Sequence, residues 1–202
     1  MPGPVVCAIL AAGTSTRMGT RKTGLLVGGT TLLERALAAS AGYARIVVVA
    51  PWSAGDAPPE TGAALVVINE APERGMAHSL RLANAAVADR DVAIAVLLAD
   101  TPLVDAALVS CVIAARGVRD IAYPVRGGVP GHPVVFGPAP RAFIDALPDG
   151  DTLRALRADP RWSRVEVEID DERPFLDIDT PADLEHARRA VAAMGHPPPA
   201  SK

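Results

Sequence analysis

A short apolar run that ends abruptly in small residues, close to the start of the chain, most constrains the fold. Residues 5–10 are apolar, and a run of this length is typical of a buried strand or of part of a core helix. The small residues that follow it are Ala11, Ala12, Gly13, Thr14, Ser15 and Thr16. Small side chains let a ligand approach the backbone, and a turn that aims several N–H groups at one point forms an anion site. The stretch therefore predicts a first strand followed by a phosphate-binding loop.

Two cations follow within reach of this turn, Arg17 and Lys22. Arginine can hold a phosphate through two parallel hydrogen bonds, and lysine adds a mobile point charge. Neither GxGxxG nor GxxxxGK[ST] occurs after Gly13, so the two common phosphate fingerprints do not apply. The alternative interpretation is an ordinary strand-to-helix turn on a solvated surface.

Strand-like and helix-like segments alternate along the rest of the chain. Thr31 stands three residues before Glu34, which is the spacing of a capping box at a helix start. We expect further strands at residues 45–50, 64–68, 92–98, 120–123, 134–136 and 164–169, with a strand end before Thr180. We expect helices from Thr31 to near Gly42, up to about Asp89, and at 105–116, 141–147, 152–158 and from Thr180 onward. This alternation predicts an α/β fold with a mostly parallel sheet and helices on both faces, and residues 92–98 as its centre because they show no polar alternation.

Composition limits the organisation and the partners. The 202 residues suit one domain, which we place at residues 2–194, with a disordered tail at 195–202. The formal net charge of −3 gives no reason to expect nucleic acid or an anionic membrane as a partner. The longest apolar stretch, residues 92–99, is far shorter than the roughly 20 residues of a membrane helix. Cys7 and Cys111 lie inside apolar runs, so we expect free thiols and a cytoplasmic protein.

Carboxylates stand where two of the predicted strands end. Asp100 follows residues 92–98, and Asp177 and Asp179 lie near the end of the last apolar segment. Ligands of open α/β sheets bind at the carboxyl ends of strands, and Mg²⁺ is commonly held by one or two carboxylates together with substrate phosphates. Asp100 and Asp179 are therefore candidate metal ligands. The alternatives are a turn or helix-capping role for Asp179 and an exposed strand position for Asp177.

Three further polar residues are candidates with equally plausible structural roles. Asn69 and Ser79 are candidates for nucleotide contact, or they form a turn and a solvated helix face. His132 lies in a Gly-His-Pro sequence between turns. It is a candidate for a substrate role, although single histidines are more often structural.

Several of these segments together resemble one known family. Residues 10–22, LAAGTSTRMGTRK, resemble the signature LAAGxSxRMGxxK of the MobA-like nucleotidyltransferases, and most closely that of their molybdenum cofactor cytidylyltransferase branch. Residues 69–80 (NEAPERGMAHSL), 97–104 (LLADTPLV), 131–136 (GHPVVF) and 177–185 (DIDTPADLE) resemble further motifs of that branch, in the same order. The resemblance covers nearly the whole chain. It implies a Rossmann-like nucleotidyltransferase fold.

The resemblance also implies roles for individual residues. Arg17 and Lys22 would hold the β- and γ-phosphates, and Asp100 and Asp179 would bind Mg²⁺, which makes Asp100, Lys22 and Arg17 the catalytic set. Gly131 and His132 would lie toward the acceptor, with Arg154 added from a partial match at residues 149–156. The implied nucleotide-binding residues are Leu10, Ala11, Ala12, Gly13, Thr14, Ser15, Arg17, Lys22, Asn69 and Ser79.

The implied reaction is attack of an acceptor phosphate on the α-phosphorus of a nucleoside triphosphate, with release of pyrophosphate. The Ala-Ala-Gly form of the first loop is associated with cytidylyl transfer, so CTP is favoured over GTP. The acceptor would be a phosphorylated cofactor such as molybdopterin, and a molybdenum enzyme would be the downstream partner. The sequence departs from the family pattern at Arg21, at Thr23-Gly24 and at Thr101, which leaves the acceptor least defined.

Two other functions are compatible with the same resemblance. The nicotine blue reductases resemble this family in sequence and use a nicotinamide dinucleotide, so an NAD(P)H-dependent reductase is one alternative. A non-catalytic nucleotide-binding factor for maturation of a molybdenum enzyme is the other. Retention of the phosphate-loop cations and of both aspartates favours the transferase.

Overall fold

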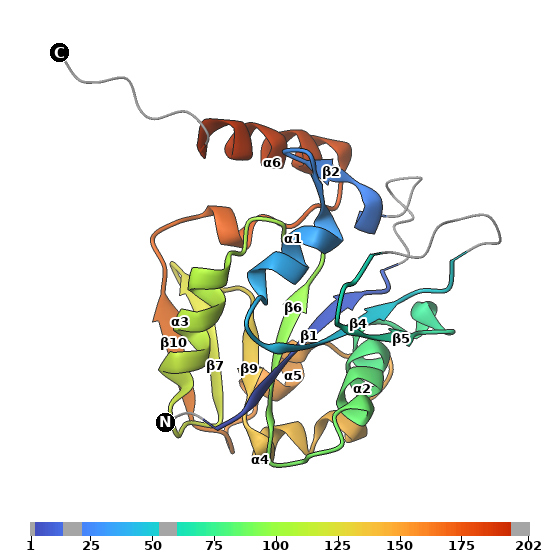
Figure 1. Cartoon of the computed structure of the whole chain (residues 1–202). Helices are drawn as coiled ribbons and strands as arrows, with labels where there is room; N and C mark the ends of the chain where they lie inside the picture. The colour runs from blue at the N-terminus through green and yellow to red at the C-terminus, as the bar shows by residue number, and fades with distance from the viewer. Residues whose placement is uncertain (1–2, 14–21, 53–59, 195–202) are drawn as a thin grey trace.

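Seven strands form one continuous path in the central sheet, in the order β10-β7-β9-β6-β1-β4-β5, and β8 pairs with β7 at the side. The computed structural model (Figure 1) describes residues 3–13, 22–52 and 60–194. The strands are β1 (Val5–Ala11), β4 (Ala44–Val49), β5 (Leu65–Ile68), β6 (Ala93–Leu98), β7 (Ile121–Arg126), β8 (Val129–Pro130), β9 (Val134–Phe136) and β10 (Arg164–Glu168). A separate hairpin consists of β2 (Leu26–Val27) and β3 (Thr30–Thr31).

The sheet is mostly parallel, as predicted. β1 pairs in parallel with β4 and β6, β4 with β5, and β7 with β10. β9 lies between β6 and β7 and is antiparallel to both. The segment that leads into β9 therefore lies at the same edge as the carboxyl ends of β6 and β7. β6 is in the middle of the order, which confirms the prediction that residues 92–98 form the centre.

Helices cover both faces of the sheet, which is also as predicted. They are α1 (Leu32–Ala39), α2 (Met76–Ala86), α3 (Ala106–Arg116), α4 (Pro138–Arg141), α5 (Leu153–Ala158) and α6 (Pro181–Met194). Short 3₁₀ turns are η1 (Lys22–Gly24), η2 (Pro72–Arg74), η3 (Ile144–Ala146) and η4 (Arg173–Phe175). Thr31 and Glu34 form the expected capping box at α1, and Asp105 caps α3. Among the described helices, none is both long and apolar enough to cross a bilayer.

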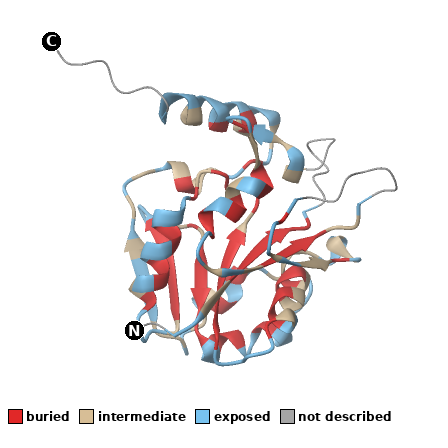
Figure 2. Cartoon of the chain, in the orientation of Figure 1, coloured by how far each residue is buried: buried red, intermediate tan, exposed pale blue. Residues whose placement is uncertain are grey.

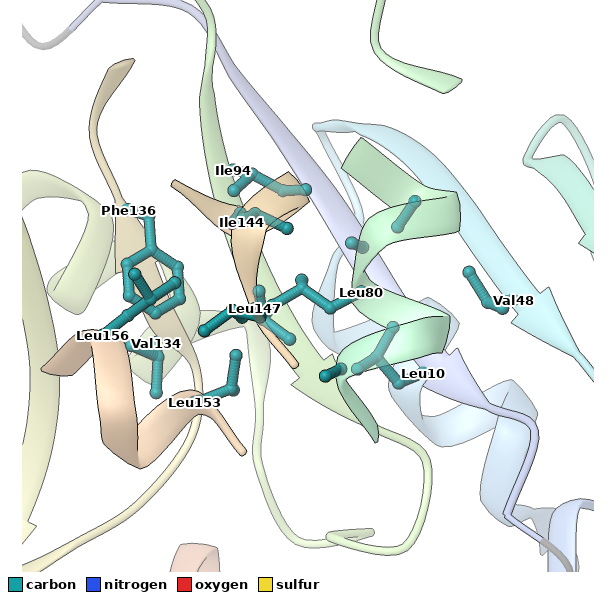
Figure 3. Close-up of a cluster of buried hydrophobic side chains, with 14 of the residues drawn as sticks. Leu10, Val48, Leu80, Ile94, Val134, Phe136, Ile144, Leu147, Leu153 and Leu156 are labelled. Atoms are coloured by element: carbon teal, nitrogen blue, oxygen red, sulfur yellow. The ribbon is translucent and has the colours of Figure 1, made fainter. Parts of the chain in front are cut away.

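Alternating side chains of the central strands supply two separate cores. Leu10, Val48 and Ile94 pack with α2 and α5 on one face, together with Leu80, Phe136 and Ile144 (Figure 3). Cys7, Ile9, Val47, Ala95 and Leu97 pack with α1 and α3 on the other face. Figure 2 shows buried residues along both the strands and the inward sides of the helices. Burial on both faces explains why β1, β4 and β6 read as continuous apolar runs.

A third, smaller core joins two segments that are far apart in the sequence. Its buried residues are Val27, Leu32, Ile178, Leu184 and Ala187. They come from the β2–β3 hairpin, the first residue of α1, and α6 with the segment before it, and Figure 1 shows α6 lying over β2. We call residues 22–32 together with 176–194 the satellite unit. Two arginines hold its hairpin: Arg188 Nε donates to Leu26 O at 3.0 Å, and Arg35 Nε and Nη2 donate to Val27 O at 2.9 and 2.6 Å.

Four expectations about the elements need correction. The helix expected at residues 141–147 is wrong, because α4 begins at Pro138 and the turn η3 replaces the second half. The strand expected immediately before Thr180 is absent, because residues 176–180 are irregular. α2 ends at Ala86 rather than near Asp89, and β7 runs on to Arg126. The expected tail at 195–202 lies outside the described residues, and the division into one domain stays a prediction.

Candidate functional site

Asp100 lies just beyond β6, in a turn that the backbone of β1 helps to fix. Ala99 N donates to Leu10 O at 3.1 Å, which continues the pairing with β1 past the last residue of the strand. Thr101 Oγ1 donates to Leu98 O at 2.9 Å and closes the turn. The Asp100 side chain remains 33% exposed. The carboxylate therefore has a fixed backbone and faces the ligand edge of the sheet.

The segment that carries Asp179 is attached directly to this turn. Ile178 N donates to Asp100 O at 2.9 Å, and the Ile178 side chain is buried in the satellite unit. Thr180 and Asp183 cap α6: Asp183 Oδ2 accepts from Thr180 N at 2.8 Å, and Thr180 Oγ1 accepts from Asp183 N at 3.3 Å. Because these two residues provide the cap, the Asp179 carboxylate is available for another partner.

That partner is Lys22, which begins η1. Lys22 Nζ lies 2.6 Å from Asp179 Oδ1 and 3.7 Å from Asp100 Oδ2. The three side chains come from positions that are far apart in the sequence, and the structure brings them together. Asp179, however, is supplied by an irregular segment and not by a strand.

Negative charge dominates this cluster. Burial raises the pKa of Asp100, the nearby Asp179 adds to the increase, and Lys22 opposes it. Removal from water, followed by the charges of Asp100 and Asp179, raises the pKa of Asp177 to about 6. Carboxylates that lie close together attract a cation, because it relieves the repulsion between them.

The two carboxylates beside Lys22 suit a divalent cation. Mg²⁺ and similar hard ions prefer oxygen ligands, and protein sites for Mg²⁺ often supply only one or two carboxylates because phosphates and water complete the shell. Among the described residues there is no group of three or more acidic, histidine or cysteine side chains arranged to chelate a metal. Asp100 and Asp179 therefore fit a metal that is held jointly with a phosphate ligand. Their role as ligands stays a prediction.

In the described part of the first loop, residues 10–13, a ligand could contact the backbone more than the side chains. Leu10 packs in the core with α2, and Ala11 and Ala12 are buried. Gly13 is exposed, and a methyl group added to it would meet no described atom within 4 Å. The structure thus assigns Leu10 a packing role. Thr14, Ser15 and Arg17 lie outside the described residues, and their predicted contacts stay predictions.

Asn69 and Ser79 bind each other. Asn69 Nδ2 donates to Ser79 Oγ at 2.9 Å, and Asn69 Oδ1 accepts from Ala71 N at 3.0 Å. Both residues are buried. The bonds hold the end of β5 against α2. The bond from Ala71 agrees with the turn expected for Asn69, whereas the solvated helix face expected for Ser79 is wrong because Ser79 is buried. Contact with a nucleotide stays a prediction.

His132 is anchored to the central strand. Its Nδ1 lies 3.2 Å from Val96 O, and because a carbonyl only accepts, Nδ1 carries the proton. Burial lowers the pKa of His132 to about 4, and the charge of Arg157 adds to this lowering. The imidazole is therefore neutral at pH 7. The neighbouring Gly131 must lack a side chain, because a Cβ there would lie 2.6 Å from a ring carbon of Phe175.

Arg154 was predicted from the sequence to lie toward the acceptor, and Arg157 was not. Arg154 is exposed on α5. Arg157, one turn later, lies with its guanidinium carbon 5.0 Å from the centre of the buried Tyr123 ring. The three-residue spacing of the two arginines was the available signal, because it places both on one face of a helix.

Two solved structures of one mycobacterial protein resemble the whole chain. Rv0371c from Mycobacterium tuberculosis H37Rv is 26% identical with a TM-score of 0.78, and the match covers 93% of this chain and 99% of that one. A structure of Rv0371c in complex with manganese gives the same identity and TM-score, over 93% and 100% of the two chains. Molybdopterin-guanine dinucleotide biosynthesis protein A from Archaeoglobus fulgidus is 16% identical with a TM-score of 0.72, over 94% and 100%. This last likeness concerns the fold alone.

Two comparisons of sequence complete the assignment. The bifunctional protein GlmU of Maricaulis maris (strain MCS10) is 34% identical over 135 residues, which are 64% of this chain and 29% of that protein. The chain thus spans less than a third of this curated relative. The family described as the MobA-like NTP transferase domain matches residues 7–165. The match covers most of the chain, and the fold agrees with it, so the protein belongs to the MobA-like NTP transferase domain family.

Proposed function

We propose that the protein is a metal-dependent nucleotidyltransferase that moves a nucleoside monophosphate from a nucleoside triphosphate to a phosphorylated acceptor and releases pyrophosphate. The observation that supports this most is the position of Lys22 Nζ between Asp179 and Asp100, 2.6 and 3.7 Å from their oxygens. A cation beside two carboxylates at the carboxyl end of a central strand suits a triphosphate accompanied by a metal ion.

Each of the three side chains has a separate task in this proposal. Lys22 exchanges a carboxylate partner for a phosphate oxygen when the nucleotide binds. Asp100 and Asp179 hold a divalent cation, which neutralises charge on the phosphates. Phosphoryl-type transfer requires mainly alignment and charge neutralisation from the protein. The fixed backbone of Asp100 provides the alignment.

The finer specificity rests on the sequence. The Ala-Ala-Gly loop favours CTP over GTP, and the later motifs favour molybdopterin as the acceptor and a molybdenum enzyme as the recipient of the product. Mg²⁺ is the proposed metal, and the manganese complex of Rv0371c makes Mn²⁺ the first substitute to test. Cys7 and Cys111 are free thiols, which supports the cytoplasm as the location.

One assay tests the proposal. The protein is incubated with CTP, GTP or ATP, with Mg²⁺ or Mn²⁺, and with molybdopterin, and pyrophosphate is measured. We expect pyrophosphate that depends on both metal and acceptor, and most of it with CTP. Oxidation of NAD(P)H by a quinone-like dye would indicate the reductase instead. Tight nucleotide binding with neither reaction would indicate the maturation factor.

A further inference from the structure

Two arginines near α5 stack on aromatic rings, and they differ in what else they bind. Arg161 lies 4.5 Å from the centre of the Phe143 ring. Its Nε and Nη2 also donate to both oxygens of Asp159, at 3.0 Å and 2.6 Å. The guanidinium of Arg157 lies on Tyr123 in the same way, but within the described part of the chain it makes no hydrogen bond or ion pair. Arg161 is thus neutralised by a carboxylate, while Arg157 is not.

The aromatic ring beneath Arg157 is itself held firmly. Tyr123 is buried, and its hydroxyl donates to Glu166 Oε1 at 2.6 Å. Tyr123 and Glu166 are register partners on β7 and β10. This bond occupies the carboxylate nearest to the stack, so Glu166 steadies the ring and does not pair with Arg157 at salt-bridge distance. A guanidinium placed over a ring can still offer its N–H groups, whose planar fork matches phosphate or carboxylate oxygens.

The surroundings of Arg157 make the local charge positive. Burial lowers the pKa of Arg157, the charges of Tyr123 and Glu166 oppose the decrease, and the charge of Arg154, one turn earlier on α5, adds to it. Like charges at this spacing destabilise a helix by a few tenths of a kcal/mol. Arg164 Nη1 donates to the backbone oxygen of Arg157 at 2.9 Å, which brings a third cation close. An anion would relieve this repulsion.

The strand register connects the positive patch to the candidate metal site. Ile94 pairs with Phe136 and Val96 with Val134, and His132 Nδ1 lies 3.2 Å from Val96 O. Asp100 follows β6 four residues after Val96, in the turn that Thr101 closes. The segment that carries His132 leads into β9, which lies between β6, the strand that leads to Asp100, and β7, the strand that carries Tyr123. Since this imidazole is neutral at pH 7, it neither neutralises Arg157 nor repels a metal.

We propose that Arg157, stacked on Tyr123 and supported by Arg154, binds the phosphate of the acceptor substrate. The inference deepens the proposed transferase function and rests on it for the identity of the acceptor. The nucleotide phosphates belong to Lys22 on the side of β1, whereas this subsite lies across His132 on the side of β7. An acceptor that binds here approaches the nucleotide from the opposite side of the crevice.

Anion binding tests the subsite without any need for turnover. Calorimetric titration with inorganic phosphate is compared for the unaltered protein, Arg157→Gln, Arg157→Lys and the matched control Arg161→Gln. Loss of a charged hydrogen bond is worth roughly 1.5–3 kcal/mol, or about 10- to 100-fold in affinity. We expect that loss for Arg157→Gln, a smaller loss for Arg157→Lys, and none for Arg161→Gln. Thermal unfolding of each variant confirms that it is folded.

Nucleotide binding and turnover complete the test. Affinity for CTP with Mg²⁺ should be unchanged in Arg157→Gln, while KM for molybdopterin rises and KM for CTP does not. Unchanged phosphate affinity in Arg157→Gln would overturn the subsite, and so would an equal loss in Arg161→Gln or a parallel loss of CTP affinity. If phosphate binding depends on Arg157 but no acceptor releases pyrophosphate, the anion site stands and the transferase proposal fails.

Discussion

The three charged side chains of the candidate site come from two regions that are built very differently. Asp100 extends from β6, which has paired strands on both sides and a hydrophobic core on each face. Lys22 and Asp179 belong to the satellite unit, whose core contains five buried residues. Regions with little buried apolar surface open at lower free-energy cost than central strands. The difference indicates that Asp100 is the fixed reference, and that Lys22 and Asp179 adjust together when a ligand binds.

Replacing the fixed carboxylate should have the largest effect. In Asp100→Asn we expect turnover to fall on the order of 100- to 1000-fold, as when one preorganised electrostatic contact is lost. Burial raises the pKa of Asp100, so the folded protein disfavours its ionised form, and a neutral amide should not lower the unfolding midpoint. Pyrophosphate release and thermal unfolding measure the two effects. Asp91→Asn, an exposed change just before β6, is the control, and undiminished turnover in Asp100→Asn would refute the role.

The contrast between the two regions also separates what the sequence could predict from what it could not. Residues 5–10 and 92–98 were identified as strands because burial on both faces leaves an uninterrupted apolar run. These predictions draw on many consecutive residues that share one environment. The meeting of Lys22, Asp100 and Asp179 was expected only from the resemblance to the family, because Asp179 does not lie at the end of a strand.

The satellite unit left no comparable signal. Val27 and Ile178 are single buried residues in short irregular segments, and they meet across about 150 positions of the chain. Periodicity cannot reveal such a pair. One local signal was available, because Thr180 and Asp183 have the spacing of a capping box. This spacing identifies Thr180 as the cap of α6 and so argues against a capping role for Asp179. The stack of Arg157 on Tyr123 depends on tertiary packing and was beyond sequence reasoning.

Matched truncations in the two regions should differ in how much they lower the unfolding free energy and in how much they raise KM. Leu80 and Leu32 are both fully buried, the first in the core beneath α2 and the second in the satellite unit. Leucine-to-alanine changes cost about 2–5 kcal/mol, depending on how far the site can collapse. We expect Leu80→Ala to lie in the upper part of that range and Leu32→Ala near its lower end.

Activity should show the reverse order. Leu32→Ala loosens the unit that carries Lys22 and Asp179, so we expect the larger increase in KM for CTP there. Leu80→Ala should leave the KM of the folded fraction nearly unchanged. Chemical denaturation and steady-state kinetics provide the two measurements. Equal losses of stability and equal KM values would contradict the distinction between the regions.

An effect of intermediate size is the pH dependence of folding stability that His132 contributes. His132 is hydrogen-bonded to Val96 O in the main sheet. Its pKa is about 4 when folded, against about 6.5 in an unfolded chain. Between these values the unfolded chain binds more protons, so this residue contributes stability that is present above pH 6.5 and is lost as the pH falls toward 4. The full contribution is about 3 kcal/mol at most, at 1.36 kcal/mol per pH unit.

The quantity to compare is the slope of unfolding free energy against pH. Unfolding free energies of the unaltered protein and of His132→Gln are measured from pH 7.5 to pH 4.5, and His186→Gln on the exposed face of α6 serves as the control. We expect a shallower decline with acid in His132→Gln only. If all three proteins lose stability in parallel, the anchoring of a neutral His132 to Val96 is not what the acid disrupts.

The smallest effect is expected from substitutions that test the contact between α6 and the hairpin. Two adjacent glycines in the hairpin provide a variant and its control. Gly28 and Gly29 both have positive φ, 62° and 78°, so alanine is strained by roughly 1–2 kcal/mol at either position. Only at Gly28 would the new Cβ collide with neighbours, because Val191 Cγ1 would lie 2.6 Å away and Arg35 Nη2 2.9 Å away, while nothing described lies within 4 Å at Gly29. We therefore expect Gly28→Ala to be the less stable variant by about 1 kcal/mol, as in other overpacked sites.

The same two variants, Gly28→Ala and Gly29→Ala, show whether the position of α6 affects nucleotide binding at the candidate site. If α6 and the hairpin hold Lys22 beside Asp179, displacement of Val191 should raise KM for CTP several-fold in Gly28→Ala and leave it unchanged in Gly29→Ala. A second change, Val191→Ala, removes the colliding methyl groups and should restore KM in the Gly28→Ala background. Failure of that rescue, with KM still raised, would mean that strain in the turn or displacement of Arg35 is responsible. The satellite unit would then hold Lys22 through the hairpin, without help from α6.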